Sequence, residues 1–194
     1  MALRKRTADA PGGKRARTRA ALIEAATKLV GEKGFERTSL EDVARSAGMS
    51  RGAIYGNFRD RDDLFLAVAT QSWRPVAPPF RAGASLREQM RILGEAVADE
   101  ADARRSRAVG ALSFQLYALT HAELRGRLRE GNARLYAWAA ESLLTFVAAE
   151  ALPMPADRFV RVLHALTEGL ILTRTLTPEL INRDVIAAAF EALA

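Results

Sequence analysis

The chain has 194 residues, of which 49% are apolar and 27% charged, so it can bury one substantial core but is barely long enough for two independent domains. It contains no Cys and only two His, which excludes disulfides, thiol catalysis and cysteine-ligated metal, and we expect neither a metal site nor a cofactor. The net charge of +6 comes entirely from residues 1–60, which contain 13 Lys and Arg residues but only 7 Asp and Glu residues. Such one-ended positive charge is typical of a segment that binds nucleic acid, although a solubilising basic tail is the alternative.

The sequence predicts a cytoplasmic protein without a membrane partner. Its longest uncharged run, residues 108–122, is shorter than the roughly 20 residues of a spanning helix and contains polar side chains. The basic start, residues 1–14, is followed by more Arg rather than by an apolar stretch, so it does not resemble a secretory signal.

From Lys14 onward every apolar segment follows the 3.6-residue period, which predicts an all-α protein of about nine helices. Residues 1–13 show no periodicity and are expected to be a disordered basic arm. The first helix, about 15–33, ends near Gly34 and has one apolar stripe: Leu22, Ala25, Ala26, Leu29 and Val30.

Three short helices follow, each opened by a residue that can cap it: Thr38 or Ser39, then Ser50, then Asp60. Gly48 interrupts the first two, and the third, about 61–74, leads to a cluster of prolines. We therefore expect a domain at 14–60 and a second at 61–194, connected by the helix at 61–74.

The helices then lengthen. Ser85 and Glu88 form a capping-box pattern, a helix at about 105–119 is apolar on two faces, and the next is expected to end only before Pro153. Two final helices are expected at about 156–174 and 178–193, the last capped by Thr177 with Pro178 at its first position.

The segment 34–58 predicts a helix-turn-helix. Two short helices with one apolar stripe each are separated by a glycine that accepts a positive φ, so the second helix is free to enter a major groove. Ile54 and Phe58 face the core, whereas Tyr55 points away from them and is expected to contact DNA.

This segment resembles the tetracycline-repressor (TetR) family of transcriptional regulators. The resemblance runs from about Arg17 to Ala69, through Thr38-Ser-Leu, Val43-Ala, Ala47-Gly-Met-Ser and Gly52-Ala-Ile-Tyr-x-x-Phe58. It implies that Thr38 and Ser39 touch phosphate, that Asn57 and Arg61 contact the DNA backbone, and that one surface reads the bases: Ser50, Arg51, Gly52, Ala53 and Tyr55. Asn57 and Arg61 depart from the family's usual residues but keep polar or cationic character, whereas Gly56 lacks a side chain that many members use.

The resemblance also implies a ligand-responsive repressor that binds an inverted-repeat operator as a homodimer. Helices from about 85 to 150 would enclose a cavity for a small, largely apolar ligand, for which we nominate Trp73, Met90, Phe114, Tyr117, His121 and Trp138. The last two helices would form the dimer interface, through Phe159, Leu163, Leu166, Leu170, Ile181, Val185 and Phe190. For both sets, ordinary core is the alternative.

Two other classes of protein compete with this interpretation. An enzyme is disfavoured because the sequence lacks a phosphate loop, GxGxxG, HExxH and GxSxG. A structural helical module that binds another protein would leave the N-terminal charge excess without a use.

Overall fold

Helices make up the regular structure, and the predicted all-α class is confirmed. The computed structural model describes residues 13–72 and 76–194, and these ranges contain nine α-helices, two 3-10 helices and no strand. The expected arm falls almost wholly outside the described residues, as does Trp73.

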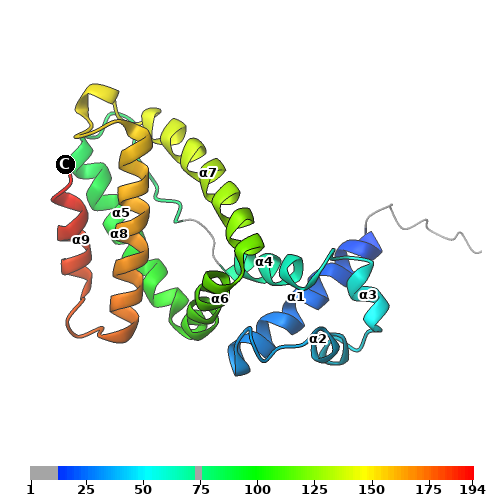
Figure 1. The fold of residues 1–194 in the computed structure, drawn as a ribbon. Coiled ribbons are helices and arrows are strands. Elements are labelled where there is room, and N and C mark those ends of the chain that lie inside the picture. The colour runs from blue at the N-terminus through cyan, green and yellow to red at the C-terminus, as the bar shows by residue number, and fades with distance from the viewer. Residues whose placement is uncertain (1–12, 73–75) are drawn as a thin grey trace, which may run out of the picture. The chain divides into compact units, whose positions relative to one another are not determined.

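The helices form two compact units (Figure 1), which do not follow the expected division at residue 60. The first unit contains α1 to α4 and α6, and the second contains α5 and α7 to α9. The helix bounds in the first unit are α1 Gly13–Lys33, α2 Leu40–Ser46, α3 Arg51–Tyr55, α4 Arg61–Ser72 and α6 Ala108–Thr120.

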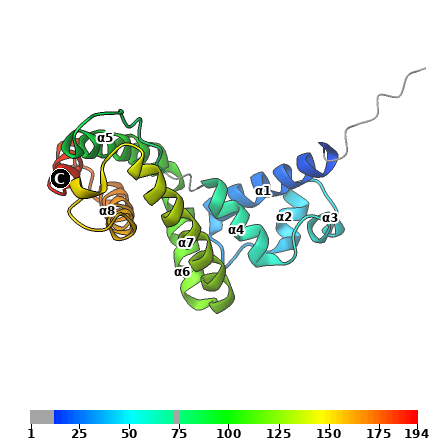
Figure 2. The ribbon, with the colours of Figure 1, turned by 90° about the horizontal axis from the view of Figure 1, so that it is seen from above.

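Capping residues set the ends of the first unit's helices. Gly34 ends α1 with a φ of +80°, where a side chain would be strained. Ser39 caps α2 by accepting the backbone N–H of Asp42 at 3.1 Å, and Asp60 caps α4 by accepting that of Asp63 at 2.6 Å. In Figure 2, α4 lies beside α1, and the two helices are in contact.

An aromatic cluster explains why α6 belongs to this unit. The ring of Phe35 lies 4.8 Å from that of Phe65 and 5.1 Å from that of Phe114, between ring centroids. Tyr117 joins the same cluster, 5.8 Å from Phe65. Because all four side chains are buried, they bind α4, α6 and the end of α1 into one core.

The second unit is built around α5, which packs against both α8 and α9, while α7 packs against α8. The bounds are α5 Leu86–Arg104, α7 Ala122–Leu144, α8 Ala156–Leu176 and α9 Arg183–Glu191. Gly94 permits the close approach of α5 to α9, since a Cβ there would lie 2.9 Å from the Cα of Ala187. The buried Gln89 fixes the preceding loop by donating to the carbonyl of Arg81 and accepting its N–H.

Two predicted helix ends are wrong. The last helix begins at Arg183, because Asn182 rather than Thr177 provides the cap, accepting the N–H of Val185 at 3.0 Å. The N–H of Thr177 instead bonds to Thr173 and ends α8. The preceding long helix, α7, ends at Leu144 and not near Pro153, and the 3-10 helix Ala149–Ala151 occupies part of the interval.

Candidate nucleic-acid interface

The helices α2 and α3 form the predicted helix-turn-helix. Gly48 in the turn between them has a φ of +64°, the left-handed conformation that the sequence predicts. Behind the motif, Val43 on α2 and Ile54 on α3 are buried, and Phe58 beyond α3 is buried with them. This core holds α3 by one face only, so its other face is free to meet a partner.

The outer face of α3 carries the predicted contact residues. Ser50, Arg51, Gly52 and Tyr55 are exposed, and Ala53 is half-buried. Tyr55 is 53% exposed, which confirms that its ring points away from the core. A Cβ on Gly52 would meet only the Ser50 hydroxyl, at 3.7 Å. A side chain at this position would therefore fit the fold and would affect only a partner bound to this face.

Arg51 is paired with two neighbours that the sequence analysis did not connect to it. Its Nη1 lies 2.8 Å from Oε1 of Glu41 on α2, and its Nη2 donates to the Tyr55 hydroxyl at 3.4 Å. The hydrogen bond to Tyr55 and the charge of Glu41 both raise the pKa of Arg51. The role of Glu41 was missed because no local pattern links residues ten apart on different helices.

Asn57 is turned back toward α3. Its amide nitrogen donates to the carbonyl of Ala53 at 2.8 Å, and the side chain is half-buried. Within the described part of the chain, its buried Oδ1 accepts no hydrogen bond. The amide nitrogen has a second N–H, so the predicted contact of Asn57 with a phosphate does not require the bond to Ala53 to break.

The structure does not support a phosphate contact by Thr38. This side chain is 1% exposed, and its hydroxyl donates to the carbonyl of Gly34 at 2.7 Å. Thr38 thus closes the turn after α1. The adjacent Ser39 is half-buried, and its hydroxyl oxygen accepts the Asp42 N–H at the start of α2.

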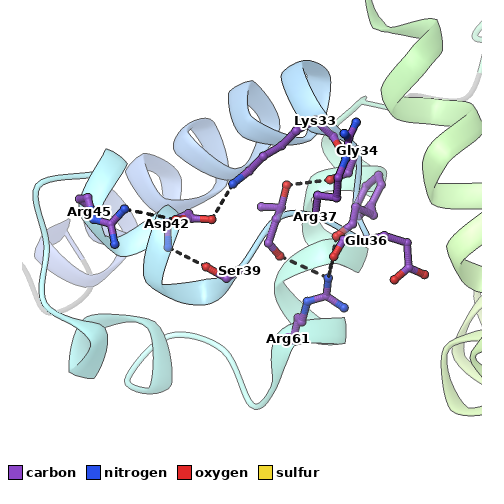
Figure 3. A network of polar contacts seen from close by, with 10 residues as sticks. Lys33, Gly34, Glu36, Arg37, Ser39, Asp42, Arg45 and Arg61 are labelled. Atoms are coloured by element: carbon purple, nitrogen blue, oxygen red, sulfur yellow. Dashed lines mark hydrogen bonds and ion pairs between the residues drawn. The ribbon is translucent and has the colours of Figure 1, made fainter.

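Arg61 also has a different role from the predicted one. Its Nη2 donates to the carbonyls of Phe35 at 2.6 Å, Thr38 at 3.2 Å and Glu36 at 3.3 Å (Figure 3). Its Nη1 donates to the Tyr117 hydroxyl at 2.7 Å, and the guanidinium lies over the Phe65 ring. These interactions turn Arg61 into the protein, where it satisfies the carbonyls of the turn at 35–38, so a phosphate contact by Arg61 would compete with these bonds.

An ion pair fixes the start of α2 against the end of α1. Lys33 donates to Asp42 at 2.5 Å, and Arg45 approaches the other carboxylate oxygen at 3.3 Å (Figure 3). The hydrogen bonds from Lys33 and from the Ser39 hydroxyl hold the pKa of Asp42 below its usual value. The helix-turn-helix is thereby oriented by both polar and apolar contacts.

The residues nominated for a ligand pocket are distributed over both units. In the first unit, Phe114 and Tyr117 are buried in the aromatic cluster, and His121 stacks on Tyr117 with 3.7 Å between ring centroids. In the second unit, Met90 is buried in the core and Trp138 is 56% exposed on α7. Burial in these cores explains Met90, Phe114 and Tyr117 without a ligand.

The residues nominated for a dimer interface also divide into two groups. Phe159, Leu163 and Phe190 are buried in the core of the second unit, so they cannot meet a partner. Leu166, Leu170 and Ile181 are half-buried, and Val185 is 40% exposed. The apolar stripes of α8 and α9 thus pack mainly into the core of their own chain.

No helix in residues 13–72 and 76–194 combines the length and hydropathy needed to cross a bilayer. The same ranges hold no cluster of three or more His, Cys, Asp or Glu side chains that could bind a metal ion.

The buried core, the glycine turn and the exposed face of α3 define a protein of the helix-turn-helix class. Residues 22–68, which span this motif, match the sequence profile of the bacterial regulatory proteins of the tetR family. This match assigns the N-terminal domain, residues 22–68, to the TetR family.

Individual relatives agree with that assignment. The chain is 44% identical over 51 residues to the transcriptional regulator AcrR of Shigella flexneri and 45% identical over 51 residues to TtgR of Pseudomonas putida. Each match covers 26% of this chain and only 24% of the relative.

Similarity to solved structures extends over most of the chain. NalD of Pseudomonas aeruginosa, the secondary repressor of the MexAB-OprM multidrug efflux pump, is 26% identical with a TM-score of 0.59, over 91% of this chain and 93% of NalD. Salmonella enterica GusR shares the fold, with a TM-score of 0.68 at 18% identity over 91% of this chain and 92% of GusR.

Proposed function

We propose that this protein is a ligand-responsive transcriptional repressor that binds an inverted-repeat operator as a homodimer and is released by a small, largely apolar molecule. The observation that carries the proposal is the coincidence of the family match at residues 22–68 with a helix-turn-helix whose short second helix exposes Arg51 and Tyr55. The role of NalD as a repressor supports the sign of the regulation. The proposed site of action is DNA in the cytoplasm.

The proposed contacts with DNA combine two kinds of residue. Arg51 and Tyr55, with Gly52 and Ala53 between them, would meet base edges in the major groove, because a guanidinium and a phenol supply directional donors. Ser39, Ser50 and Asn57 would position the helix on phosphates.

A two-fold symmetric partner follows from the size of the reading helix. Because α3 has only five residues, one copy makes few base contacts, and an inverted repeat supplies the second half-site. On α8, Val162 is 38% exposed and lies on one stripe with the half-buried Leu166 and Leu170. We propose this stripe, with Val185 on α9, as the dimer contact.

An enzyme and a structural module remain the competing classes. The relatives named above are transcriptional regulators, which supports a protein without catalytic activity. A structural module would not require cationic and aromatic side chains on the outer face of α3.

A salt-dependent gel-shift experiment tests the proposal. The protein should enrich one inverted repeat from a randomised duplex pool and bind it at least 10³-fold, on the order expected for specific recognition, more tightly than bulk DNA. Its affinity should fall as salt rises. Failure to enrich any sequence would contradict the proposal.

Ligand control has its own test. A compound that releases the protein from the enriched duplex should bind the operator complex more weakly than the free protein, by the same factor by which it weakens DNA binding. Calorimetry on both forms measures this factor, and equal affinities would show that the compound does not act through the proposed coupling.

A further inference from the structure

Two neighbours hold Arg51 in one pose on the outer face of α3. Glu41 binds one end of the guanidinium at 2.8 Å, and the Tyr55 hydroxyl accepts a long hydrogen bond from the other at 3.4 Å. The guanidinium carbon also lies 5.9 Å from the centroid of the Tyr55 ring. A guanidinium has five N–H donors, so three remain for another partner while both contacts persist.

We infer that Glu41 is a specificity-determining residue, which holds Arg51 in the pose that reads a base and penalises its movement to a phosphate. This inference rests on the proposed DNA binding and deepens it. Glu41 acts through Arg51, so it is a positioning residue and needs no contact of its own with DNA.

Glu41 affects specificity only if it acts differently on two poses of Arg51. In the held pose the remaining donors can meet the edge of a base, and the pair with Glu41 is kept. A swing toward a phosphate breaks that pair, so Glu41 disfavours the contact that all DNA sequences offer equally. A carboxylate that acted equally on both poses would change affinity but not specificity.

Exposure sets the size of the effect. The side chains of Arg51 and Glu41 are 59% and 47% exposed, so water and salt screen their attraction. Exposed pairs of this kind change an equilibrium by about one- to fivefold. We therefore expect Glu41 to adjust specificity by a few-fold and not to decide whether DNA binds.

The test compares the full-length protein with its variants Glu41→Gln and Glu41→Ala. Glutamine removes the charge and keeps an oxygen acceptor, whereas alanine removes both. A duplex enriched from a randomised pool by the unchanged protein serves as the specific probe, and bulk DNA serves as the non-specific probe. The specificity ratio is the affinity for the first divided by the affinity for the second.

Loss of Glu41 should lower the specificity ratio by about two- to fivefold, more in the alanine variant than in the glutamine variant. Non-specific binding should tighten, and its salt dependence should steepen by about 0.9 in log–log slope, as expected for one added phosphate contact. Binding-site selection with Glu41→Ala should relax the same base pair that Arg51→Ala relaxes.

Two controls separate this effect from a general gain of positive charge. Glu36→Gln changes the net charge equally on an exposed residue of the same unit that forms no ion pair with Arg51, and it should leave the specificity ratio unchanged. In an Arg51→Ala background, Glu41→Ala should no longer change the ratio.

The inference is overturned if Glu41→Ala alters specific and non-specific affinity by the same factor, or if Glu36→Gln matches its effect. Failure of the unchanged protein to enrich any duplex is a distinct result, since it removes the proposed function together with the inference.

Discussion

Replacement of Arg61 by lysine distinguishes a structural arginine from a phosphate contact. Lysine keeps the charge, so a phosphate contact would survive, but its ammonium cannot reproduce the planar fork that reaches three carbonyls and the Tyr117 hydroxyl. Each hydrogen bond to a charged group contributes about 1.5–3 kcal/mol when its partner would otherwise stay buried. Allowing the ammonium to keep some of the four bonds, we expect Arg61→Lys to reduce the free energy of unfolding by about 2 kcal/mol.

Alanine at the same position should cost about 4 kcal/mol, because it also removes the packing of the guanidinium on Phe65, 4.5 Å from the ring centroid. Urea denaturation followed by circular dichroism measures both changes, and about 2 kcal/mol corresponds to a midpoint shift of about 1 M.

The matched control is Arg45→Lys, since the Arg45 side chain is 78% exposed and its replacement should alter stability by less than about 0.5 kcal/mol. Unchanged stability of Arg61→Lys would refute the structural role. A loss of salt dependence in the DNA binding of Arg61→Ala, once corrected for its folded fraction, would restore the phosphate contact.

Three further predictions follow from burial and titration. Tyr55→Ala should weaken binding to the enriched duplex at least tenfold, or by about 1.4 kcal/mol, in a gel shift, without lowering the melting temperature. Ile54→Asp should instead unfold the first unit, as circular dichroism would show, because it buries an unpaired charge. Leu170→Asp should yield a folded monomer by sizing chromatography if α8 forms the dimer, but Phe190→Asp should unfold the second unit, and a folded Phe190 variant would contradict its place in the core. Burial, with a hydrogen bond to Asp62, raises the pKa of Tyr117 from 10 to about 12. The neutral hydroxyl therefore stabilises the folded state below pH 10, and this contribution to the free energy of unfolding is lost as pH rises from 10 to 12. Tyr117→Phe should remove that part of the loss of stability at alkaline pH, and an unchanged dependence of stability on pH would count against this reasoning.

Local patterns predicted the parts of the fold that local physics controls. The caps at Ser39 and Asp60 follow from hydroxyl and carboxylate side chains before apolar periodic segments, and the buried Ile54 follows from helical spacing. The start of α9 was wrong because Thr177-Pro178 and Asn182 are both good start signals, and packing selected the second.

Tertiary packing decided what the sequence left open. An amphipathic stripe shows that a helix face is covered, but it does not tell whether the same chain or a partner covers it, which is why Phe159 and Phe190 were assigned to an interface. Glu41 pairs with Arg51, and Arg61 donates to the carbonyls of the turn at 35–38. Both contacts join residues on different elements, and no rule of sequence spacing predicts such contacts. These are the contacts that connect the candidate site with the rest of its unit.

The bonds that join Arg61 to the turn at 35–38 and to Tyr117 offer a route for the proposed ligand control. Ser113 and Tyr117 on α6 hold the end of α1 and the start of α4, since the Ser113 hydroxyl accepts the N–H of Phe35 at 2.9 Å and Tyr117 bonds to Arg61. The chain enters α6 from the second unit and returns to it after His121, so we propose α6 as the route by which a ligand-induced rearrangement of that unit would act on the first. A shift of α6 would pull on the turn that ends at the cap of α2.

To use this route a ligand must bind the shifted state more tightly, and each 1.4 kcal/mol of preference changes the ratio of the two states by about tenfold. Because Arg61 and Tyr117 carry the connection, their removal should weaken the coupling between ligand and DNA more than it weakens the binding of either alone.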